Sequence, residues 1–294
     1  TRLVTVIRTF HCSSFFSSKK ILINFCPTGV NPTKKMTPFV PISPEEIAEQ
    51  TFEVYKLGVS MVHIHARDMN GNNTNDKETY GKIIKLIREK CPDIIIITSL
   101  TGRINNNFES RSSVLELNDN LKPDMGSLTL SSLNFSKSES INTPEMIVKL
   151  IEKMNDKNIK PELEVFDNGM INASKYYIDK GLLKPPFYYN LMIGNLFTSQ
   201  DTLNDISSMI NNLPENSIFS LGGIGDCQMR INFLSLLYAN GVRVGLEDFI
   251  YKNENRKELA SNYFLVERLV NFCKENNIEI MKPNEVRKML NLDF

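Results

Sequence analysis

The chain has 294 residues, 41% of them hydrophobic and 23% charged, a composition that suits a soluble globular protein with a large core. Lysine plus arginine equals aspartate plus glutamate at 34 each, so no net charge favours nucleic acid or an anionic membrane. No apolar run approaches the length of a membrane span, and the five cysteines lack CxxC spacing, so we expect reduced thiols.

The first twenty residues differ in composition from the rest of the chain. They are rich in Arg, Lys, Ser, Thr and Phe, and no acidic residue occurs before Glu45. This composition is typical of an organellar transit peptide, and equally of an upstream extension. We therefore expect residues 1–20 to be an N-terminal extension, either targeting or disordered, and residues 21–294 to form one catalytic domain. We expect a cytoplasmic protein, or an organellar one if the extension is a transit peptide.

The first predicted elements are a strand, a loop and a helix. Ile21–Phe25 is a short apolar run, and residues 26–33 form a loop with two prolines and a glycine. The helix starts at Ser43, which is the predicted N-cap. Pro44 occupies the first turn and Glu46 completes a capping box.

The rest of the chain alternates strands with helices. Residues 93–99 are β-branched without alternation, which indicates a strand buried on both faces of a parallel sheet. After the strand around His63, the predicted strands are 93–99, 124–130, 162–166, 187–193, 217–221 and 241–244. The later helices are 76–90, 143–154, 172–180, 201–211, 226–239 and 259–274. Eight strands alternating with helices predict a single-domain (β/α)₈ TIM barrel, and a doubly wound open sheet is the alternative.

Two of the three histidines lie two residues apart in the segment Met61–Asp68. On a strand, residues i and i+2 point to the same face, so His63 and His65 project side by side. Arg67 follows on that face if the strand continues. Two neutral imidazoles at this spacing can occupy adjacent positions on one divalent metal.

Other polar residues follow the carboxyl ends of predicted strands, where barrel enzymes place their chemistry. Closure of a barrel puts strand eight beside strand one, and strand one beside the histidine strand. Glu247 could therefore complete a His₂Glu site with an open position, as in catalytic zinc sites. The candidates at strand ends are Ser99, Gly102, Ser127, Thr129, Glu164, Arg243, Glu247 and Asp248.

Each candidate also has a structural interpretation. A lone HxH is more often a hydrogen-bonded pair than a metal site, and most acidic residues are solvated. Glu164, on a strand interior, is as well explained by an ion pair inside the barrel. Arg243 lies among apolar residues and needs an anionic partner, and Asp248 is near in sequence.

Five segments together resemble the β-keto acid cleavage enzymes. The pairing of His-x-His-x-Arg-Asp with a late Arg-x-Gly-x-Glu-Asp is specific, and the resemblance runs from about Ile21 to the C-terminus. The segments are 24–29, the helix start at 41–47, 62–68, 121–135 and 242–248. The resemblance implies a (β/α)₈ barrel, a homotetramer, and condensation of a β-keto acid with acetyl-CoA to give acetoacetate and a new acyl-CoA.

The resemblance also implies roles for individual residues. His63, His65 and Glu247 match the family's zinc ligands, and Arg243 matches an arginine that orients the base, here Asp248. Ser99 and Gly102 match positions that hold the substrate carboxylate, and Ser127 or Thr129 matches a hydroxyl that lines the pocket.

Position 31 differs from the best known member of this family. That member has a glutamate in the loop after strand one, which binds a substrate amino group, and Asn31 stands here instead. A neutral amide cannot pair with an ammonium as a carboxylate does. We therefore expect a β-keto acid with a neutral tail.

Two further interpretations stay open. The first is another metal-dependent TIM-barrel aldolase or lyase, of the HMG-CoA lyase type. A binuclear amidohydrolase would need more histidines than His11 supplies. The second is a non-catalytic zinc-binding barrel, which would hold the metal and turn nothing over.

Overall fold

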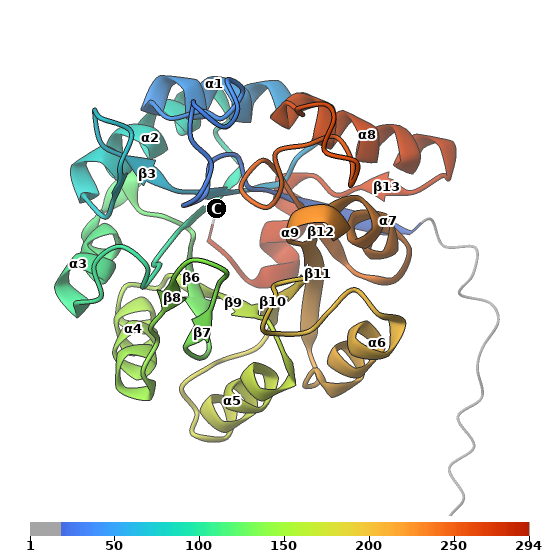
Figure 1. Ribbon diagram of the computed structural model, residues 1–294. Helices are drawn as coiled ribbons and strands as arrows, with labels where there is room; N and C mark the ends of the chain where they lie inside the picture. Colours follow the sequence, from blue (N-terminus) through green and yellow to red (C-terminus); the bar gives the residue numbers. More distant parts are fainter. Residues whose placement is uncertain (1–18, 294) are drawn as a thin grey trace, which may run out of the picture.

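The structure is a computed structural model that describes residues 19–293. Within these residues, eight parallel strands close into a barrel, since β12 pairs with both β11 and β1 (Figure 1). The barrel strands are β1 (Lys20–Phe25), β2 (Met61–Ile64), β5 (Ile95–Thr98), β6 (Met125–Thr129), β9 (Lys160–Val165), β10 (Phe187–Ile193), β11 (Ser217–Gly223) and β12 (Gly241–Val244). The predicted (β/α)₈ barrel is confirmed, and the open sheet is excluded.

Helices surround the barrel and cover its strands (Figure 1). The predicted capping box is present, because the Ser43 side chain accepts from the Glu46 amide and the Glu46 carboxylate accepts from the Ser43 amide. The side chains of Asp76 and Thr143 cap two later helices by accepting from the amides of Thr79 and Met146, without the reciprocal bond. The helices are α1 (Pro44–Tyr55), α2 (Lys77–Lys90), α4 (Pro144–Asp156), α5 (Asn168–Asp179), α6 (Leu203–Asn212), α7 (Gln228–Tyr238) and α8 (Asn262–Glu275).

Several short elements were not predicted from the sequence. Two-residue strands form the hairpins β3 (Ala66–Arg67) with β4 (Asn73–Thr74) and β7 (Leu133–Asn134) with β8 (Glu139–Ser140), and β13 (Glu279–Ile280) pairs with β1. The helix α3 (Phe108–Ser112) and the 3₁₀ turns at 113–116, 119–121 and 225–227 are equally short. Elements of this length carry no hydrophobic period, so a pattern search does not detect them.

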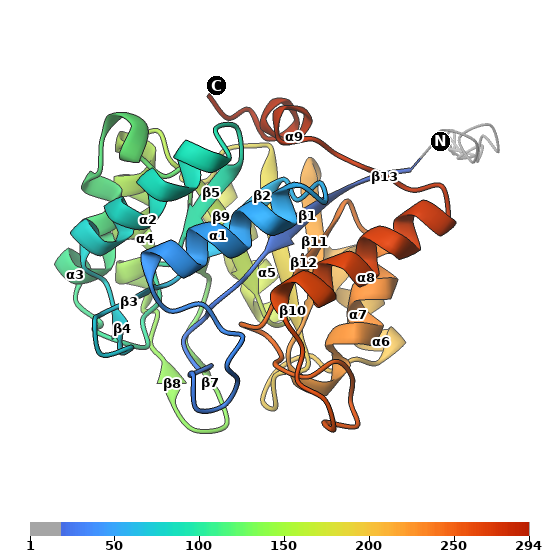
Figure 2. The ribbon, with the colours of Figure 1, turned by 90° about the horizontal axis from the view of Figure 1, so that it is seen from above.

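The helix α9 (Pro283–Leu290) lies across the amino ends of the strands (Figure 2). Its Val286 and Leu290 pack against the inward side chains of the lower barrel layer, among them Leu22, Met61 and Tyr188. Arg287, on the same helix, is buried and donates to the carboxylate of Asp124 and to the carbonyl groups of Asp93, Ile94 and Asp293. Helix α9 therefore closes the amino-terminal end of the barrel interior.

The first barrel strand begins one residue before the predicted start of the catalytic domain. β1 begins at Lys20, whose backbone pairs with Glu279, so residue 20 belongs to the barrel and not to the extension. Residues 1–18, to which the prediction of a targeting or disordered segment applies, lie outside the described residues. Among the residues described, no helix is long and apolar enough to cross a membrane. The cysteines at 26, 91, 227 and 273 are buried and free.

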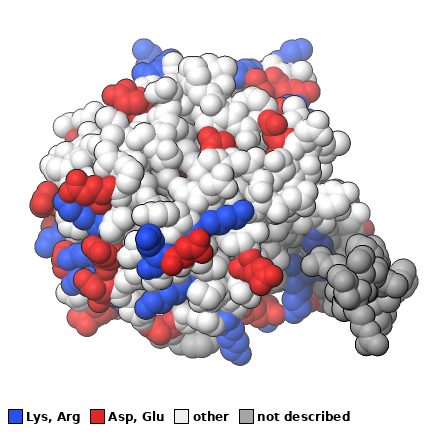
Figure 3. Space-filling view, turned by 90° about the horizontal axis from the view of Figure 1, so that it is seen from below, with Lys and Arg blue, Asp and Glu red and all other residues white. Residues whose placement is uncertain are grey.

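Charged side chains mix on the surface. On the face shown in Figure 3, Lys and Arg side chains lie beside Asp and Glu side chains and do not gather into a patch of one sign. Lys149 with Glu145 on α4 is an exposed pair of this kind.

We expect Arg287→Ala to destabilise the protein, because it weakens the attachment of α9 to the amino ends of the strands. The substitution leaves the Asp124 carboxylate and the carbonyl groups of Asp93 and Ile94 short of a donor, a loss of about 3 kcal/mol in the free energy of unfolding. Urea unfolding followed by circular dichroism measures it. The control Lys149→Ala removes one partner of an exposed pair and should leave the midpoint unchanged. Equal midpoints for both variants would contradict this role of Arg287.

Candidate active site

The histidine pair lies where the sequence placed it, at the end of β2. His63 and His65 are both buried, and their Nε2 atoms are 3.3 Å apart. The two rings are tilted by 32° with centroids 5.2 Å apart. Two ring nitrogens this close need either a proton or a cation between them, because two bare lone pairs repel.

A buried carboxylate fixes the orientation of His63. Oε2 of Glu162, on β9, lies 2.6 Å from Nδ1 of His63. Oε1 of Glu162 accepts from the amides of Asn24 at 2.7 Å and Asn190 at 2.5 Å. With Nδ1 of His63 donating to Glu162, Nε2 is free to bind a metal, the arrangement that metal-ligating histidines commonly show.

The electrostatics of this pair favour a positive charge. Burial alone would lower the pKa of His63, but the charges of Glu162 and Glu247 outweigh burial and raise it to about 9. Burial likewise opposes ionisation of Glu162, yet His63, Arg243 and Asn24 hold its pKa below the ordinary value. The site therefore stabilises a proton on His63, whereas burial lowers the pKa of His65. A cation bound at Nε2 of His63 would be stabilised by the same carboxylates.

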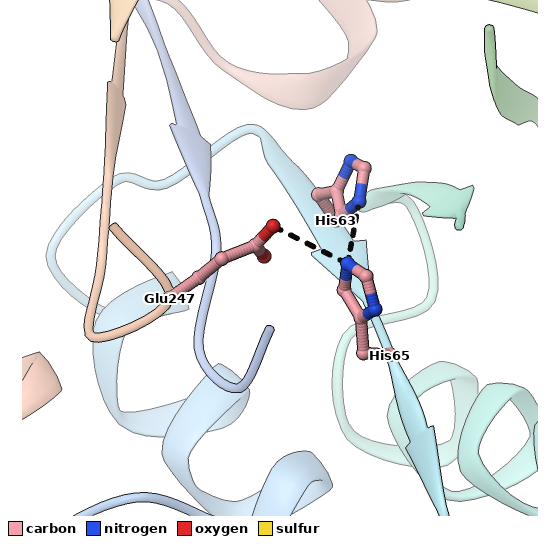
Figure 4. A group of neighbouring side chains, drawn as sticks. All are labelled: His63, His65 and Glu247. Atoms are coloured by element: carbon pink, nitrogen blue, oxygen red, sulfur yellow. Dashed lines mark hydrogen bonds and ion pairs between the residues drawn. The ribbon is translucent and has the colours of Figure 1, made fainter. Parts of the chain in front are cut away.

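Glu247 reaches the histidines from the loop after β12 (Figure 4). Its Oε1 lies 3.2 Å from Nε2 of His65 and accepts from Nη2 of Arg243 at 2.7 Å. Its Oε2 is buried and has no hydrogen-bond partner among the described residues. Ligand atoms of His63, His65 and Glu247 all lie within 4.8 Å of one another. The unsatisfied oxygen and the two imidazoles are a donor set that fits a zinc ion.

A second set of ligands, formed by His63, Glu162 and Glu164, meets the same distance limit. It fits a metal less well, because Glu162 already accepts hydrogen bonds from His63, Asn24 and Asn190. Oε2 of Glu164 likewise accepts from the Thr129 hydroxyl at 3.0 Å.

Close backbone approaches allow Glu247 to enter the site. A Cβ on Gly245 would lie 1.9 Å from the carbonyl oxygen of Cys26, so the turn after β12 requires glycine there. A Cβ on Gly29, in the loop after β1, would lie 2.4 Å from Cγ of Glu247. Both glycines belong to the motifs on which the family resemblance rests.

Arg243 is fully buried at the centre of a group of carboxylates. Its Nε donates to Asp248 at 3.1 Å, its Nη2 to Glu247, and its Nη1 to Glu164 at 3.4 Å. The predicted ion pair of Arg243 with Asp248 is therefore present. Burial raises the pKa of Asp248 to about 6, although Arg243 opposes the rise.

These side chains border a cavity of about 100 Å³ at the carboxyl ends of the strands. Of the predicted substrate contacts, Asn31, Ser99 and Thr129 line it, whereas Ser127 and Gly102 do not. The Ser127 hydroxyl instead accepts from the amide of Leu100 at 3.2 Å. Gly102 packs so tightly that a Cβ would lie 2.5 Å from the carbonyl oxygen of Ile141. A larger hollow of about 670 Å³, at the opposite end beside α9, contains none of the predicted site residues.

The structure also adds residues that the sequence did not assign. Glu162 lies two positions before Glu164, a spacing that puts both on one face of the strand and could have revealed it. Arg67 does not continue the histidine face, because β2 ends at Ile64. It is buried and donates to the carbonyl groups of Gly29, Pro32 and Gly71, which positions the loop after β1. Arg103 lines the cavity beside Asn31.

Comparison with known proteins decides the family. Residues 20–292 match the family model described as beta-keto acid cleavage enzyme. The chain belongs to the β-keto acid cleavage enzyme family. It is 34% identical to a 3-keto-5-aminohexanoate cleavage enzyme of Fusobacterium nucleatum, over 93% of this chain and 98% of that protein.

Relatives within the same range differ in the substrates their names state. A 3-dehydrocarnitine:acetyl-CoA trimethylamine transferase of Rhizobium meliloti is 30% identical over 94% of this chain and 97% of its own. The solved structure of ObcA with oxaloacetate superposes with a TM-score of 0.74, at 20% identity, over 87% of this chain and 68% of that one, which shows the shared fold.

We expect Glu162→Gln to weaken metal binding by about 10- to 100-fold, because it removes the negative charge that supports His63. Competition between the protein and a chromophoric chelator for Zn²⁺ measures the affinity. Glu164→Gln is the matched control, since it removes the same charge two residues along the strand with no hydrogen bond to a histidine. Equal losses in both variants would show a general charge effect and not support of His63.

Proposed function

We propose that the protein is a zinc-dependent acyltransferase that condenses a β-keto acid with acetyl-CoA, giving acetoacetate and a new acyl-CoA. The observation that carries the proposal is the unsatisfied, buried Oε2 of Glu247 beside two histidine Nε2 atoms. Family membership supports it, since the named relatives are cleavage enzymes or acetyl-CoA-dependent transferases.

His63, His65 and Glu247 would hold the zinc. When bound, the ion would supply a Lewis acid that polarises the keto group of the substrate. Three nitrogen and oxygen ligands leave a position open for substrate, as catalytic zinc sites require. Glu162 would keep His63 in the tautomer that leaves Nε2 unprotonated.

Asp248 would act as the base. The hydrogens on the carbon between the keto and carboxyl groups are the acidic ones of a β-keto acid, and removing one leaves its electron pair on that carbon as an enolate. With a pKa of about 6, Asp248 is ionised at neutral pH yet more basic than an ordinary aspartate. Arg243 holds both of its oxygens and sets its direction.

The hydroxyl-bearing residues Ser99 and Thr129 line the same cavity and would donate to the substrate. The enolate carbon attacks the thioester carbonyl of acetyl-CoA, the acetyl C–S bond breaks, and CoA leaves as a thiolate. The thiolate attacks the keto carbon of the β-keto acid, the bond between the keto carbon and the former enolate carbon breaks, and the new acyl-CoA forms. The carbanion left on that carbon takes the proton back from Asp248 and becomes acetoacetate.

Incubation with acetyl-CoA and a panel of β-keto acids, scored by acetoacetate formation, tests this function. A lyase or aldolase of the same fold would cleave its substrate without acetyl-CoA. A non-catalytic zinc-binding barrel would bind zinc and form no product. Acetoacetate formed only in the presence of both substrates supports the proposal.

We expect the purified protein to contain one zinc per chain and the double variant His63→Ala/His65→Ala to lose it. Removing two of three ligands leaves a single carboxylate, which cannot hold the ion against buffer. Inductively coupled plasma mass spectrometry measures the metal, with circular dichroism to show that the variant is folded. A folded double variant that keeps its zinc would refute this site.

We expect Asp248→Asn to retain the metal and to lower kcat by about 100-fold or more, because the amide keeps the shape of the side chain but cannot accept the proton. KM should change little. The control is Asp68→Asn in the segment 62–68, since Asp68 is half-buried and its carboxylate accepts hydrogen bonds only within its own turn. Activity of Asp248→Asn close to that of the control would remove Asp248 from the mechanism.

The homotetramer, the cytoplasmic location and the absence of nucleic-acid or membrane partners stay predictions. Light scattering after gel filtration measures the assembly. The expectation of a neutral substrate tail depends on Asn31 meeting the tail by itself. Asn31 instead accepts a hydrogen bond from Arg103, which lines the cavity and brings a positive charge to it.

A further inference from the structure

Arg103 is a cation at the edge of the cavity without a carboxylate partner. It follows β5 and lines the cavity together with Asn31 and Phe135. Among the described residues, no aspartate or glutamate forms an ion pair with it, whereas Arg243, in the same cavity, contacts three carboxylates. The charge of Arg103 is therefore available to a ligand.

The surroundings of Arg103 hold it in one orientation. Its guanidinium lies over the ring of Phe135, 4.4 Å from the centroid, and Phe135 packs edge-on against Phe166. Its Nη2 donates to Oδ1 of Asn31 at 2.9 Å and to the Ser138 hydroxyl at 3.1 Å. A guanidinium stacked and tied in this way loses little freedom when it binds a carboxylate.

The hydrogen-bonding capacity of Arg103 is only partly used. Its Nε is buried without a partner, and its Nη1 donates to no described residue. Burial lowers the pKa of the guanidinium, and the charge of Glu247 partly offsets this. An arginine remains protonated at neutral pH, so a desolvated positive charge stands beside the position that the family resemblance assigns to the substrate tail.

We propose that Arg103, held by Asn31, selects a β-keto acid whose tail carries a second carboxylate. This inference rests on the proposed function and replaces the neutral tail expected from Asn31 by itself. The amide oxygen of Asn31 accepts a hydrogen bond from Arg103, so Asn31 orients the cation that would meet the tail. A cationic tail would meet Arg103 with a like charge, and a neutral tail would leave it unpaired.

The asparagine at position 31 is essential to this reading. A glutamate there would cancel the charge of Arg103, and its second oxygen could accept a hydrogen bond from an ammonium. With asparagine, the same contact leaves the charge of Arg103 intact. Residue 31 together with Arg103 thus determines whether this part of the pocket is positive, as with asparagine, or neutral, as with glutamate.

The test compares three β-keto acids that differ in tail charge: 3-oxoadipate, 3-oxohexanoate and 3-keto-5-aminohexanoate. We expect the parent to prefer 3-oxoadipate. Arg103→Gln should lower kcat/KM for 3-oxoadipate by about 10- to 100-fold, the worth of a charge-assisted hydrogen bond, and leave 3-oxohexanoate within about 3-fold. Arg103→Lys should recover part of the loss, because lysine keeps the positive charge but lacks the two parallel N–H donors with which a guanidinium binds a carboxylate.

Asn31→Glu is the second variant, since it neutralises Arg103 without removing it. It should lower activity on 3-oxoadipate and raise activity on 3-keto-5-aminohexanoate. Arg256→Gln is the matched control, because Arg256 lies over Phe249 outside the cavity lining and is paired with Asp226. This control should leave kcat/KM unchanged for all three β-keto acids.

Three results would overturn the proposal. Equal losses on all tails in Arg103→Gln would place Arg103 on the common carboxylate or in a structural role. A rise in the KM for acetyl-CoA by itself would place it on a CoA phosphate. A parent that prefers the cationic tail would reverse the charge assignment.

Failure of the proposed function would look different. In that case no β-keto acid would yield acetoacetate, and calorimetric binding of 3-oxoadipate and 3-oxohexanoate to parent and Arg103→Gln would still test Arg103. We expect tighter binding of the diacid to the parent, and no difference between the two acids in the variant. Equal binding of both acids to the parent would overturn the inference.

Discussion

The guanidinium of Arg243 is the charge on which the candidate site depends. It is fully buried at the end of β12, and a buried cation is costly unless carboxylates surround it. Glu164, Glu247 and Asp248 meet it from two different segments of the chain. Removing Arg243 would leave three acidic groups near one another without their central counter-charge. The site would then lose both the orientation of Asp248 and the approach of Glu247 to the histidines.

The single positive charge of Arg243 does not balance all the carboxylates around it. The excess negative charge favours binding of a metal cation. Glu162 and Glu247 have pKa values held below the ordinary range, so both are carboxylates. Burial raises the pKa of Glu164 and of Asp248, which shows how strongly further negative charge is disfavoured there. A divalent cation between His63, His65 and Glu247 would relieve this repulsion. It would also give Oε2 of Glu247 the partner that it lacks.

The predictable part of the fold and site follows from short-range patterns. The strand period places His63 beside His65, and the β-branched strand at 93–99 indicates a helix-covered parallel sheet. Closure of the barrel then brings Glu247 to the histidines without further information. Ser43, Asp76 and Thr143 mark helix starts because each caps its own backbone, which is a local interaction.

What the sequence could not provide are contacts across the barrel and between loops. Glu162 meets His63 although β5 and β6 separate their strands in the sheet, so the contact depends on the side chains that fill the barrel interior. Ser127 and Thr129 differ by two residues and share a face, yet only Thr129 reaches the cavity, because Ser127 accepts from the neighbouring strand end. Neither strand propensity nor spacing contains this information.

The contact between Asn31 and Arg103 shows how this limit affects the prediction of specificity. The two residues are 72 positions apart on loops that follow β1 and β5. Considered by itself, Asn31 is a neutral side chain, and it predicts a pocket without charge around the substrate tail. Taken with Arg103 it is part of a cationic group, since an amide oxygen can hold a guanidinium without cancelling its charge. Under the proposals made above, the substrate would then meet positive charge at both ends, from the metal at its head and from Arg103 at its tail. If Arg103 selects the tail as we propose, selection in this barrel is a property of a pair of loop residues, and neither residue determines it separately.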